Sequence, residues 1–183
     1  KLASVARPFQ TAMLAVGTVL AAATTWGDIF YVSPTGTNTA AFTRTDPGDL
    51  RTAINTKTSS TRTSWDNGDV VCLLPGTYDF SEWSSAGDLL TCNKPYLTVR
   101  SDDGKPETCV ILGRGDDVRI SEDGLTTNTP PLLRAFYLTK NTRIIGLTVT
   151  HFYCQDNGAA VCGYTKTPYE LRDCVFGGNR TTG

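Results

Sequence analysis

The chain has 183 residues, of which 39% are hydrophobic and 19% are charged, and its formal net charge is −1. This length favours one domain with its own core, and this composition is typical of a soluble protein. Nucleic-acid-binding proteins normally carry a basic face, whereas a near-neutral balance of charge attracts neither nucleic acid nor anionic lipid. We therefore expect no nucleic-acid partner.

The first 27 residues have the pattern of a secretory signal peptide. The basic residues Lys1 and Arg7 precede an apolar run at 11–23 that ends in small residues. This run is shorter than the ~20 residues that span a bilayer. A buried N-terminal helix is the alternative. We expect residues 1–27 to be a signal peptide whose own start is missing, and the mature fragment, without a membrane span, to be secreted or held at the cell surface.

Residues 28–67 predict one strand, a loop and a short amphipathic helix. A β-rich run at 28–33 is followed by a loop, after which Asp46 has the side chain and position of a helix N-cap. Pro47 suits the first helical position, and apolar residues then follow with i, i+3 and i+4 spacing. These residues are Leu50, Ala53 and Ile54. We expect a helix over 47–57 that covers the end of a β core.

From residue 68 onward the sequence predicts short strands that are each closed by Gly, Asn, Asp or Pro. The runs lie at 69–74, 96–100, 109–112, 135–138, 142–150, 159–162 and 171–176. The helical pattern needed for βαβ crossovers does not separate them, so a doubly wound α/β sheet is disfavoured. Two folds remain, an antiparallel sandwich and a solenoid in which each strand stacks on its equivalent one coil later.

A recurring spacing favours the solenoid. Residues 147–149 and 174–176 carry the same apolar-x-apolar pattern 27 positions apart, and Val70 and Leu97 have the same separation. Repeat architectures have periods of about 20–50 residues. A short strand buries its apolar face in such a fold because equivalent side chains of successive coils form a continuous ladder.

Four sequence segments resemble those of a known family of β proteins. They are 49–55, 68–78, 143–150 and 171–179. In these segments the chain resembles the N-terminal portion of right-handed parallel β-helix proteins of the pectin-lyase-like superfamily. It is similar to the members with polymorphic-outer-membrane-protein or autotransporter-like repeats. Those repeats usually contain a Gly-Gly-Ala-Ile block, and the nearest match to it in this chain is the segment 158–162.

The resemblance implies an all-β fold, a right-handed parallel β-helix (solenoid) with a short N-terminal capping α-helix. Residues 28–67 would then hold the first strand, loop and capping helix. Residues 68–183 would be the first coils, truncated at the C-terminus.

The same resemblance leaves the function open, because this superfamily contains lyases, glycosidases, epimerases, adhesins and passenger domains. We expect a secreted or cell-surface scaffold, structural or adhesive, with no catalytic set in this fragment. Its partners would be polysaccharide or host and cell-surface ligands. The alternative is the N-terminal part of a carbohydrate-active enzyme, a polysaccharide lyase or glycoside hydrolase, whose catalytic coils lie beyond residue 183.

Three side chains are candidates for catalysis. Asp156 and Asp173 lie in neighbouring repeats, and two carboxylates facing one groove are what a glycosidase requires. His151 follows a strand and is a candidate general base. The simpler interpretation is that all three are surface or turn residues.

Four aromatic residues are candidates for carbohydrate binding, because exposed rings stack on sugars. They are Phe152, Tyr153, Tyr164 and Tyr169. They follow the strand that carries the clearest repeat pattern. The alternative is that they pack the corner of a coil.

We expect no metal site and no cofactor. Acidic pairs at 102–103, 116–117 and 122–123 have the oxygen ligands that calcium prefers, but neighbouring glycines make them ordinary turns. Six cysteines occur without a C-x-x-C pair and with a single histidine, which predicts structural thiols or disulfides and not zinc ligands. The cysteines are Cys72, Cys92, Cys109, Cys154, Cys162 and Cys174.

Overall fold

The structure is a computed structural model that describes residues 26–114, 119–120, 127–128, 133–154, 158–164 and 166–181. Several predictions lie outside these residues. They are the signal peptide up to residue 25, the acidic pairs at 116–117 and 122–123, and the catalytic candidate Asp156.

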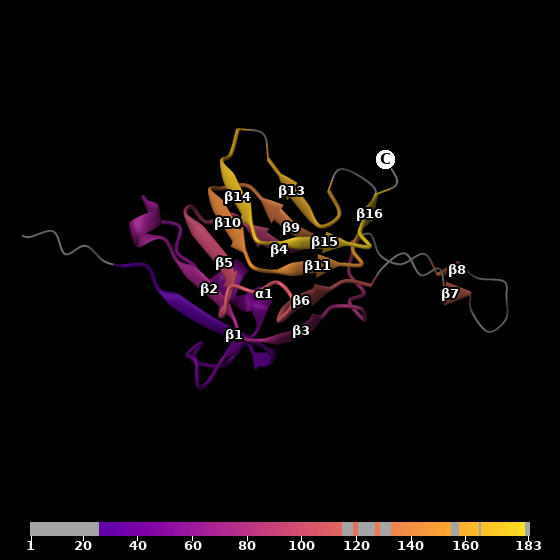
Figure 1. Cartoon of the computed structure of the whole chain (residues 1–183), viewed down its shortest axis with the longest axis horizontal. Coiled ribbons are helices and arrows are strands. Elements are labelled where there is room, and N and C mark those ends of the chain that lie inside the picture. The colour runs from indigo at the N-terminus through magenta and orange to yellow at the C-terminus, as the bar shows by residue number, and fades with distance from the viewer. Residues whose placement is uncertain are drawn as a thin grey trace, which may run out of the picture.

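The described chain is mostly β, and three larger sheets are built mainly from parallel strands (Figure 1). Sheet A contains, in spatial order, β1 (Ile29–Thr37), β2 (Val70–Leu73), β5 (Leu97–Ser101), β10 (Thr142–Ile145) and β14 (Tyr169–Arg172). Sheet B contains β15 (Val175–Gly177), β11 (Thr148–Thr150), β6 (Cys109–Leu112) and β3 (Gly76–Asp79). This arrangement excludes the antiparallel sandwich.

Sheet C is centred on β9 (Leu133–Leu138). Its other strands are β4 (Gly87–Cys92), β12 (Tyr153–Cys154), β13 (Val161–Gly163) and β16 (Arg180–Thr181). Its strand pairs are parallel except for β12 with β9, which is antiparallel. A separate antiparallel pair joins β7 (Arg119–Ile120) to β8 (Thr127–Asn128).

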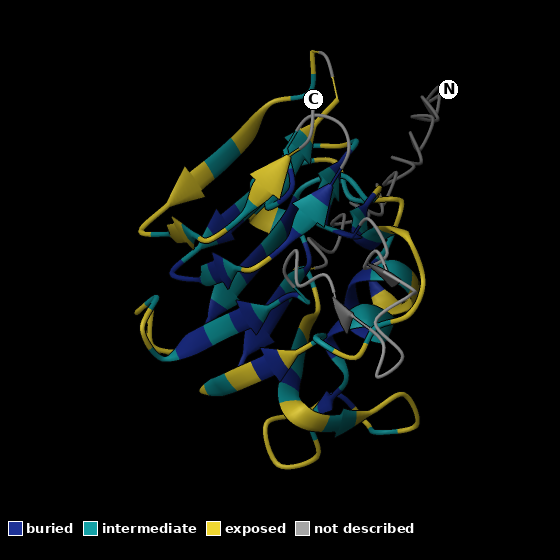
Figure 2. Ribbon diagram, turned by 90° about the vertical axis from the view of Figure 1, so that its right-hand side faces the viewer, coloured by how far each residue is buried: buried dark blue, intermediate teal, exposed yellow. Residues whose placement is uncertain are grey.

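From β2 onward the chain passes through sheets A, B and C in that order and then repeats the order. One such pass is called a winding here. Equivalent strands of successive windings pair, so their side chains form rows called rungs. The rung of sheet A contains Phe30, Val71, Val99, Ile144 and Leu171, and that of sheet B contains Tyr78, Ile111, Val149 and Phe176. The inner members of both rungs belong to the apolar core, whereas Leu171 and Phe176 of the last winding are exposed (Figure 2).

The predicted spacing of 27 residues is found between the last two windings. Val149 of β11 pairs with Phe176 of β15, and the partners of β10 in β14 are also 27 positions later. Earlier windings are longer, since Gly87 of β4 pairs with Leu133 of β9. The segment between β6 and β9, which includes β7 and β8, lengthens this winding.

One predicted register is wrong by a single residue. Val70 pairs with Thr98 and not with Leu97. A slip of one residue exchanges the two faces of a strand. The observed register places Val71 opposite Val99, and both side chains have 0% exposure, whereas Val70 is only half-buried.

The predicted helix is present but begins later than expected. It consists of α1 (Leu50–Thr52), continued by the π-helical turn η1 (Ala53–Lys57), and a separate 3₁₀ turn, η2 (Trp65–Asn67), precedes β2. Asp46 is not its cap, because its carboxylate accepts a hydrogen bond from the Ala41 N–H at 2.8 Å. The N-cap is Asp49, whose Oδ1 accepts from the Thr52 N–H at 2.8 Å.

The apolar stripe of this helix is confirmed. Leu50, Ala53 and Ile54 are buried and belong to the core, where the helix contacts β1 and β4. The first strand is also part of the same body, since Ile29 of β1 pairs with Val70 of β2. The parallel pairing of sheet A therefore starts at β1, before residue 68.

Candidate functional site

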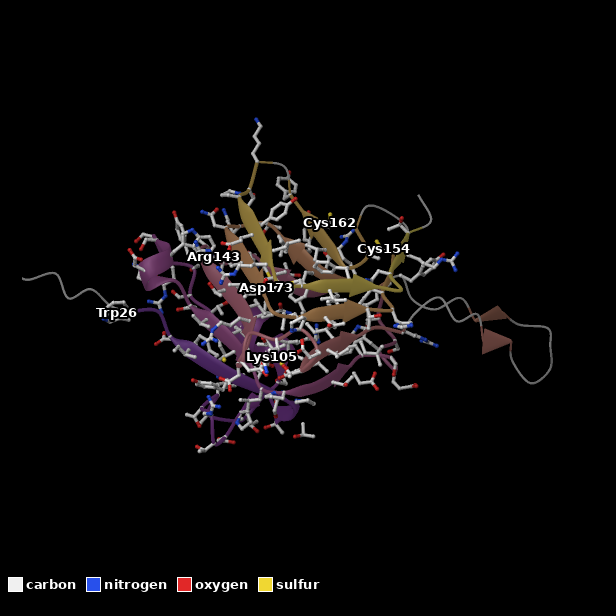
Figure 3. All side chains as sticks on the ribbon, viewed as in Figure 1. Trp26, Lys105, Arg143, Cys154, Cys162 and Asp173 are labelled. Carbon is white, nitrogen blue, oxygen red and sulfur yellow. The ribbon has the colours of Figure 1, made fainter. Side chains whose placement is uncertain are left out.

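The two described catalytic candidates are turn residues. His151 follows β11 and Asp173 precedes β15, so they lie at opposite ends of this strand pair, and Figure 3 labels Asp173 at its corner. Both are exposed and have positive φ, 58° and 53°, which is rare outside turns. His151 Nδ1 lies 2.7 Å from Thr150 Oγ1, and Asp173 lies 3.7 Å from the guanidinium of Arg172. The structure does not bring the two together.

The four aromatic candidates are placed differently. Phe152 is 1% exposed and belongs to the core, so its ring has no face for a sugar. Tyr153 is half-buried in β12, whereas Tyr164 and Tyr169 are 59% and 52% exposed. The Tyr169 ring lies against the backbone of Gly163, where a Cβ would come within 2.5 Å of it. Tyr164 and Tyr169 are therefore the two carbohydrate-binding candidates with exposed rings.

Both carboxylates of the acidic pair at 102–103 accept hydrogen bonds from other groups of the protein. Asp102 accepts two hydrogen bonds from the guanidinium of Arg44, at 2.9 and 2.6 Å. Asp103 accepts from the Lys105 N–H and from the Thr108 hydroxyl, and these donors hold its pKa below the usual range. Within the described residues no group of three or more His, Cys, Asp or Glu side chains is positioned to hold a metal ion.

All six cysteines are free thiols, which decides between the two predicted states. Burial raises the pKa of Cys72 to about 11 and that of Cys92 to about 12. Cys109 also has a raised pKa, again because of burial, and its Sγ donates to the Leu73 carbonyl at 3.4 Å. Because the thiolate is the nucleophile, these buried thiols are structural.

At about pH 8, we expect iodoacetamide to modify Cys162 and Cys174, which are half-buried, well before the four buried cysteines. A rise of the Cys72 pKa from 9.0 to about 11 lowers its thiolate fraction about a hundredfold. Mass spectrometry of timed samples would give the order, and unfolding in urea should make all six react. Equal labelling of the six in the native protein would contradict this burial pattern.

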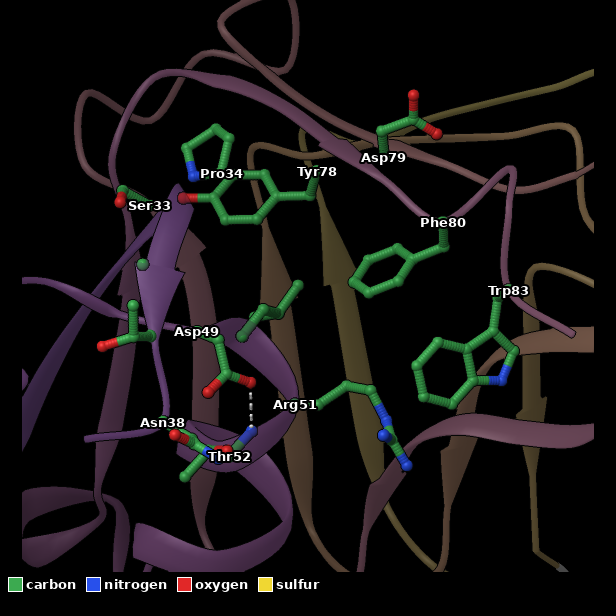
Figure 4. A pocket seen from close by; sticks show the side chains of 13 residues that line it. Ser33, Pro34, Asn38, Asp49, Arg51, Thr52, Tyr78, Asp79, Phe80 and Trp83 are labelled. Atoms are coloured by element: carbon green, nitrogen blue, oxygen red, sulfur yellow. Dashed lines mark hydrogen bonds between the residues drawn. The ribbon is translucent and has the colours of Figure 1, made fainter. Parts of the chain in front are cut away.

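A pocket of about 480 Å³ lies where the end of β1, the start of α1, and β3 with the turn after it come together (Figure 4). Tyr78 forms part of its wall. Its ring is 3% exposed, and its hydroxyl lies 2.8 Å from the Val32 carbonyl and 2.9 Å from the Leu74 carbonyl. Burial raises the pKa of this phenol, so it stays neutral. The wall is thus anchored to β1 and to the turn between β2 and β3.

Two aromatic rings form a second side of the pocket. Phe80 and Trp83 follow β3 in a turn where the Trp83 N–H donates to the Phe80 carbonyl at 3.0 Å. The guanidinium of Arg51 stacks over the Trp83 ring, 4.2 Å from its centroid. Arg51 Nε also donates to the Leu89 carbonyl at 3.3 Å, so the cation and the indole hold each other in place.

Two carboxylates contribute negative charge. Asp49 uses Oδ1 as the helix cap, whereas its Oδ2 is buried and has no hydrogen-bond partner in the protein. Asp79 accepts from the Ser81 N–H at 2.8 Å, and its hydrogen bonding to Ser81 lowers its pKa. Figure 4 shows the Asp79 carboxylate directed away from Phe80.

None of these pocket residues was predicted as a site residue. Two large aromatics in the otherwise polar stretch 80–85 were the available signal, because such side chains seldom occur in a simple loop. Asp49 and Arg51 gave no signal, since an acidic residue is ordinary at the start of a helix and arginine is a good helix former.

Comparisons of the chain with protein-family models, with curated proteins and with solved structures find no match. The resemblance to the pectin-lyase-like superfamily therefore rests on the four sequence segments alone. Within the part of the chain that the structure describes, no helix has the length and apolar character needed to cross a bilayer.

Proposed function

We propose that this chain is the N-terminal portion of a right-handed parallel β-helix of the pectin-lyase-like type, and that it serves as a structural or adhesive scaffold outside the cell. One observation carries the proposal, the repeated order of sheets A, B and C with equivalent strands in parallel register. Connections between parallel strands of one sheet are almost always right-handed, which supports that hand.

The placement of the catalytic candidates supports a scaffold over an enzyme. A glycosidase requires its two carboxyl groups within about 5–9.5 Å of each other, at one groove. Of the predicted carboxyl pair, Asp156 lies outside the described residues and Asp173 is an exposed turn residue beside Arg172, while the acidic pair at 102–103 is held by Arg44, Lys105 and Thr108. Among the described residues, the predicted catalytic side chains therefore belong to turns and do not form a catalytic site.

The site of action follows from the first residues of the sequence. The basic flank and the apolar run at 11–23 favour export, and the scaffold would then lie in the medium or at the cell surface. Polysaccharides and surface ligands are the partners that this location provides.

The scaffold role predicts that the purified protein does not turn over polysaccharides. It would be incubated with starch, xylan, polygalacturonate and alginate, and new reducing ends and unsaturated products would be measured. We expect neither product, while a hydrolase and a lyase act on the same polymers as positive controls. Steady turnover that co-purifies with the protein and is lost in His151→Ala or Asp173→Asn would overturn the scaffold role.

A further inference from the structure

We propose that the pocket formed by β1, α1 and the turn after β3 binds a neutral saccharide. This goes beyond the scaffold role and does not depend on it. The pocket volume, about 480 Å³, lies within the range of about 300–1,000 Å³ that is usual for small-molecule sites. Its lining combines aromatic rings with a few polar groups, the combination that such sites use to fix the orientation of a ligand.

The aromatic side of the pocket fits the apolar face of a pyranose ring. Phe80 and Trp83 are half-buried, and Figure 4 shows both rings on the same side of the cavity, with the guanidinium of Arg51 beside Trp83. Indole and phenyl rings offer flat apolar area against which the C–H face of a sugar packs. Because Arg51 stacks on Trp83 at 4.2 Å and is tied to the Leu89 carbonyl, the indole is held in position before a ligand arrives.

The polar side of the pocket needs a hydroxyl donor. Asp49 Oδ2 is buried and has no partner in the protein, and a buried acceptor without a donor is costly. A sugar hydroxyl is a donor that meets this need. The N–H groups of the Arg51 guanidinium beyond Nε add donors for ring or hydroxyl oxygens.

The charges favour a neutral sugar over an acidic one. The pocket lining contains two carboxylates, Asp49 and Asp79, and one guanidinium, Arg51. Asp79 has a lowered pKa because of its hydrogen bonds to Ser81, so it carries its charge at neutral pH. A uronate would meet more negative than positive charge, whereas a neutral ring carries no charge for the carboxylates to repel.

The test is isothermal titration calorimetry of the full chain. The neutral ligands are xylohexaose, mannohexaose and cellohexaose, and hexagalacturonate is the acidic counterpart. We expect at least one neutral hexasaccharide to bind and hexagalacturonate to bind more weakly or not at all. Asp49→Asn keeps a good N-cap residue but replaces the Oδ2 acceptor with a donor, so affinity should fall about tenfold, as for the loss of one hydrogen bond to a charged group.

Trp83→Ala should weaken binding at least as much as Asp49→Asn, and Tyr164→Ala, an exposed aromatic outside this pocket, should leave binding unchanged. Trp83→Phe assigns the Trp83 indole N–H signal in the nuclear magnetic resonance spectrum. In the unmutated protein this signal should shift on titration while those of Trp26 and Trp65 stay in place, a readout that does not rely on an alanine variant folding.

Three results would overturn the proposal. They are an absence of binding by all three neutral sugars, tighter binding of hexagalacturonate, or a Trp83 signal that does not move while a sugar binds. None of these affects the scaffold role, which fails on polysaccharide turnover instead.

Discussion

The free energy of unfolding is expected to fall by about 3–5 kcal/mol when Asp69 is replaced by Ala. The Asp69 side chain is 2% exposed and holds three segments together. It accepts hydrogen bonds from the Asp28 N–H at 3.0 Å, from the Ser59 N–H at 2.5 Å and from Arg62 Nε at 2.7 Å.

The cost is large because the substitution leaves buried groups behind. Arg62 is 12% exposed, and without Asp69 its remaining carboxylate partner is Asp28, which is 67% exposed. A buried cation that loses its partner, together with backbone N–H groups that lose an acceptor, is among the few causes of a loss of this size. The parallel pairing of β1 with β2 starts beside this carboxylate, so β1 should loosen first.

Urea denaturation followed by circular dichroism would measure this loss. The control is Asp173→Asn, which removes an exposed negative charge 3.7 Å from an exposed arginine, keeps a residue type that tolerates the positive φ of this turn, and should change stability by less than about 0.5 kcal/mol. If Asp69→Ala were as mild as this control, Asp69 would not hold the first strand as described.

Ile144→Ala is expected to destabilise the protein by about 2–5 kcal/mol, because it leaves a cavity in the rung of sheet A. Ile144 has 0% exposure and lies between Val99 and Leu171, its partners in β5 and β14. Its neighbours are secured by strand pairing on both sides, so the structure has little freedom to fill the space.

A double-mutant cycle would show that the rung is continuous. Val99→Ala and Ile144→Ala should couple by about 0.5–3 kcal/mol, as residues in contact do. Phe30 belongs to the same rung but is three strand spacings away from Ile144, about 14 Å, so Phe30→Ala should add to Ile144→Ala without coupling. Additivity for Val99 with Ile144 would mean that the parallel register is not the one described.

Local patterns were enough to predict most of the elements. The runs at 69–74, 96–100, 109–112 and 142–150 correspond to β2, β5, β6 and the pair β10–β11. The stripe of the helix was also correct, because burial of one helix face leaves an i, i+3, i+4 pattern in the sequence. The strands β3, β4, β7, β8, β12 and β16 were missed, being short or interrupted by polar residues.

The helix cap depended on a hydrogen bond within a loop, and the strand register depended on pairing between distant segments. Asp46 and Asp49 are equally good caps by residue type, and the choice between them came from the Ala41 N–H, which engages Asp46 within the loop. Val70 and Val71 are equally apolar, and only pairing with β5 decided which one faces the core.

The pocket, too, could not be predicted from local sequence patterns. Its residues come from the end of β1, from 49–52 and from 78–83, and no local pattern joins these segments. The stacking of Arg51 on Trp83 and the unpartnered Asp49 oxygen exist only once β3 pairs with β6 and the helix packs beside β1.

By itself, the sequence determined that this protein is built from short, parallel-compatible strands with one amphipathic helix, because alternation and i, i+3, i+4 spacing are properties of neighbouring residues. The tertiary structure alone decided the register, the length of each winding, the helix cap and the pocket. The cap depends on a loop hydrogen bond that engages Asp46. The register and the winding lengths depend on which strands meet across 25 to 46 positions of chain, where small differences in burial and hydrogen bonding select one pairing among several with similar local patterns.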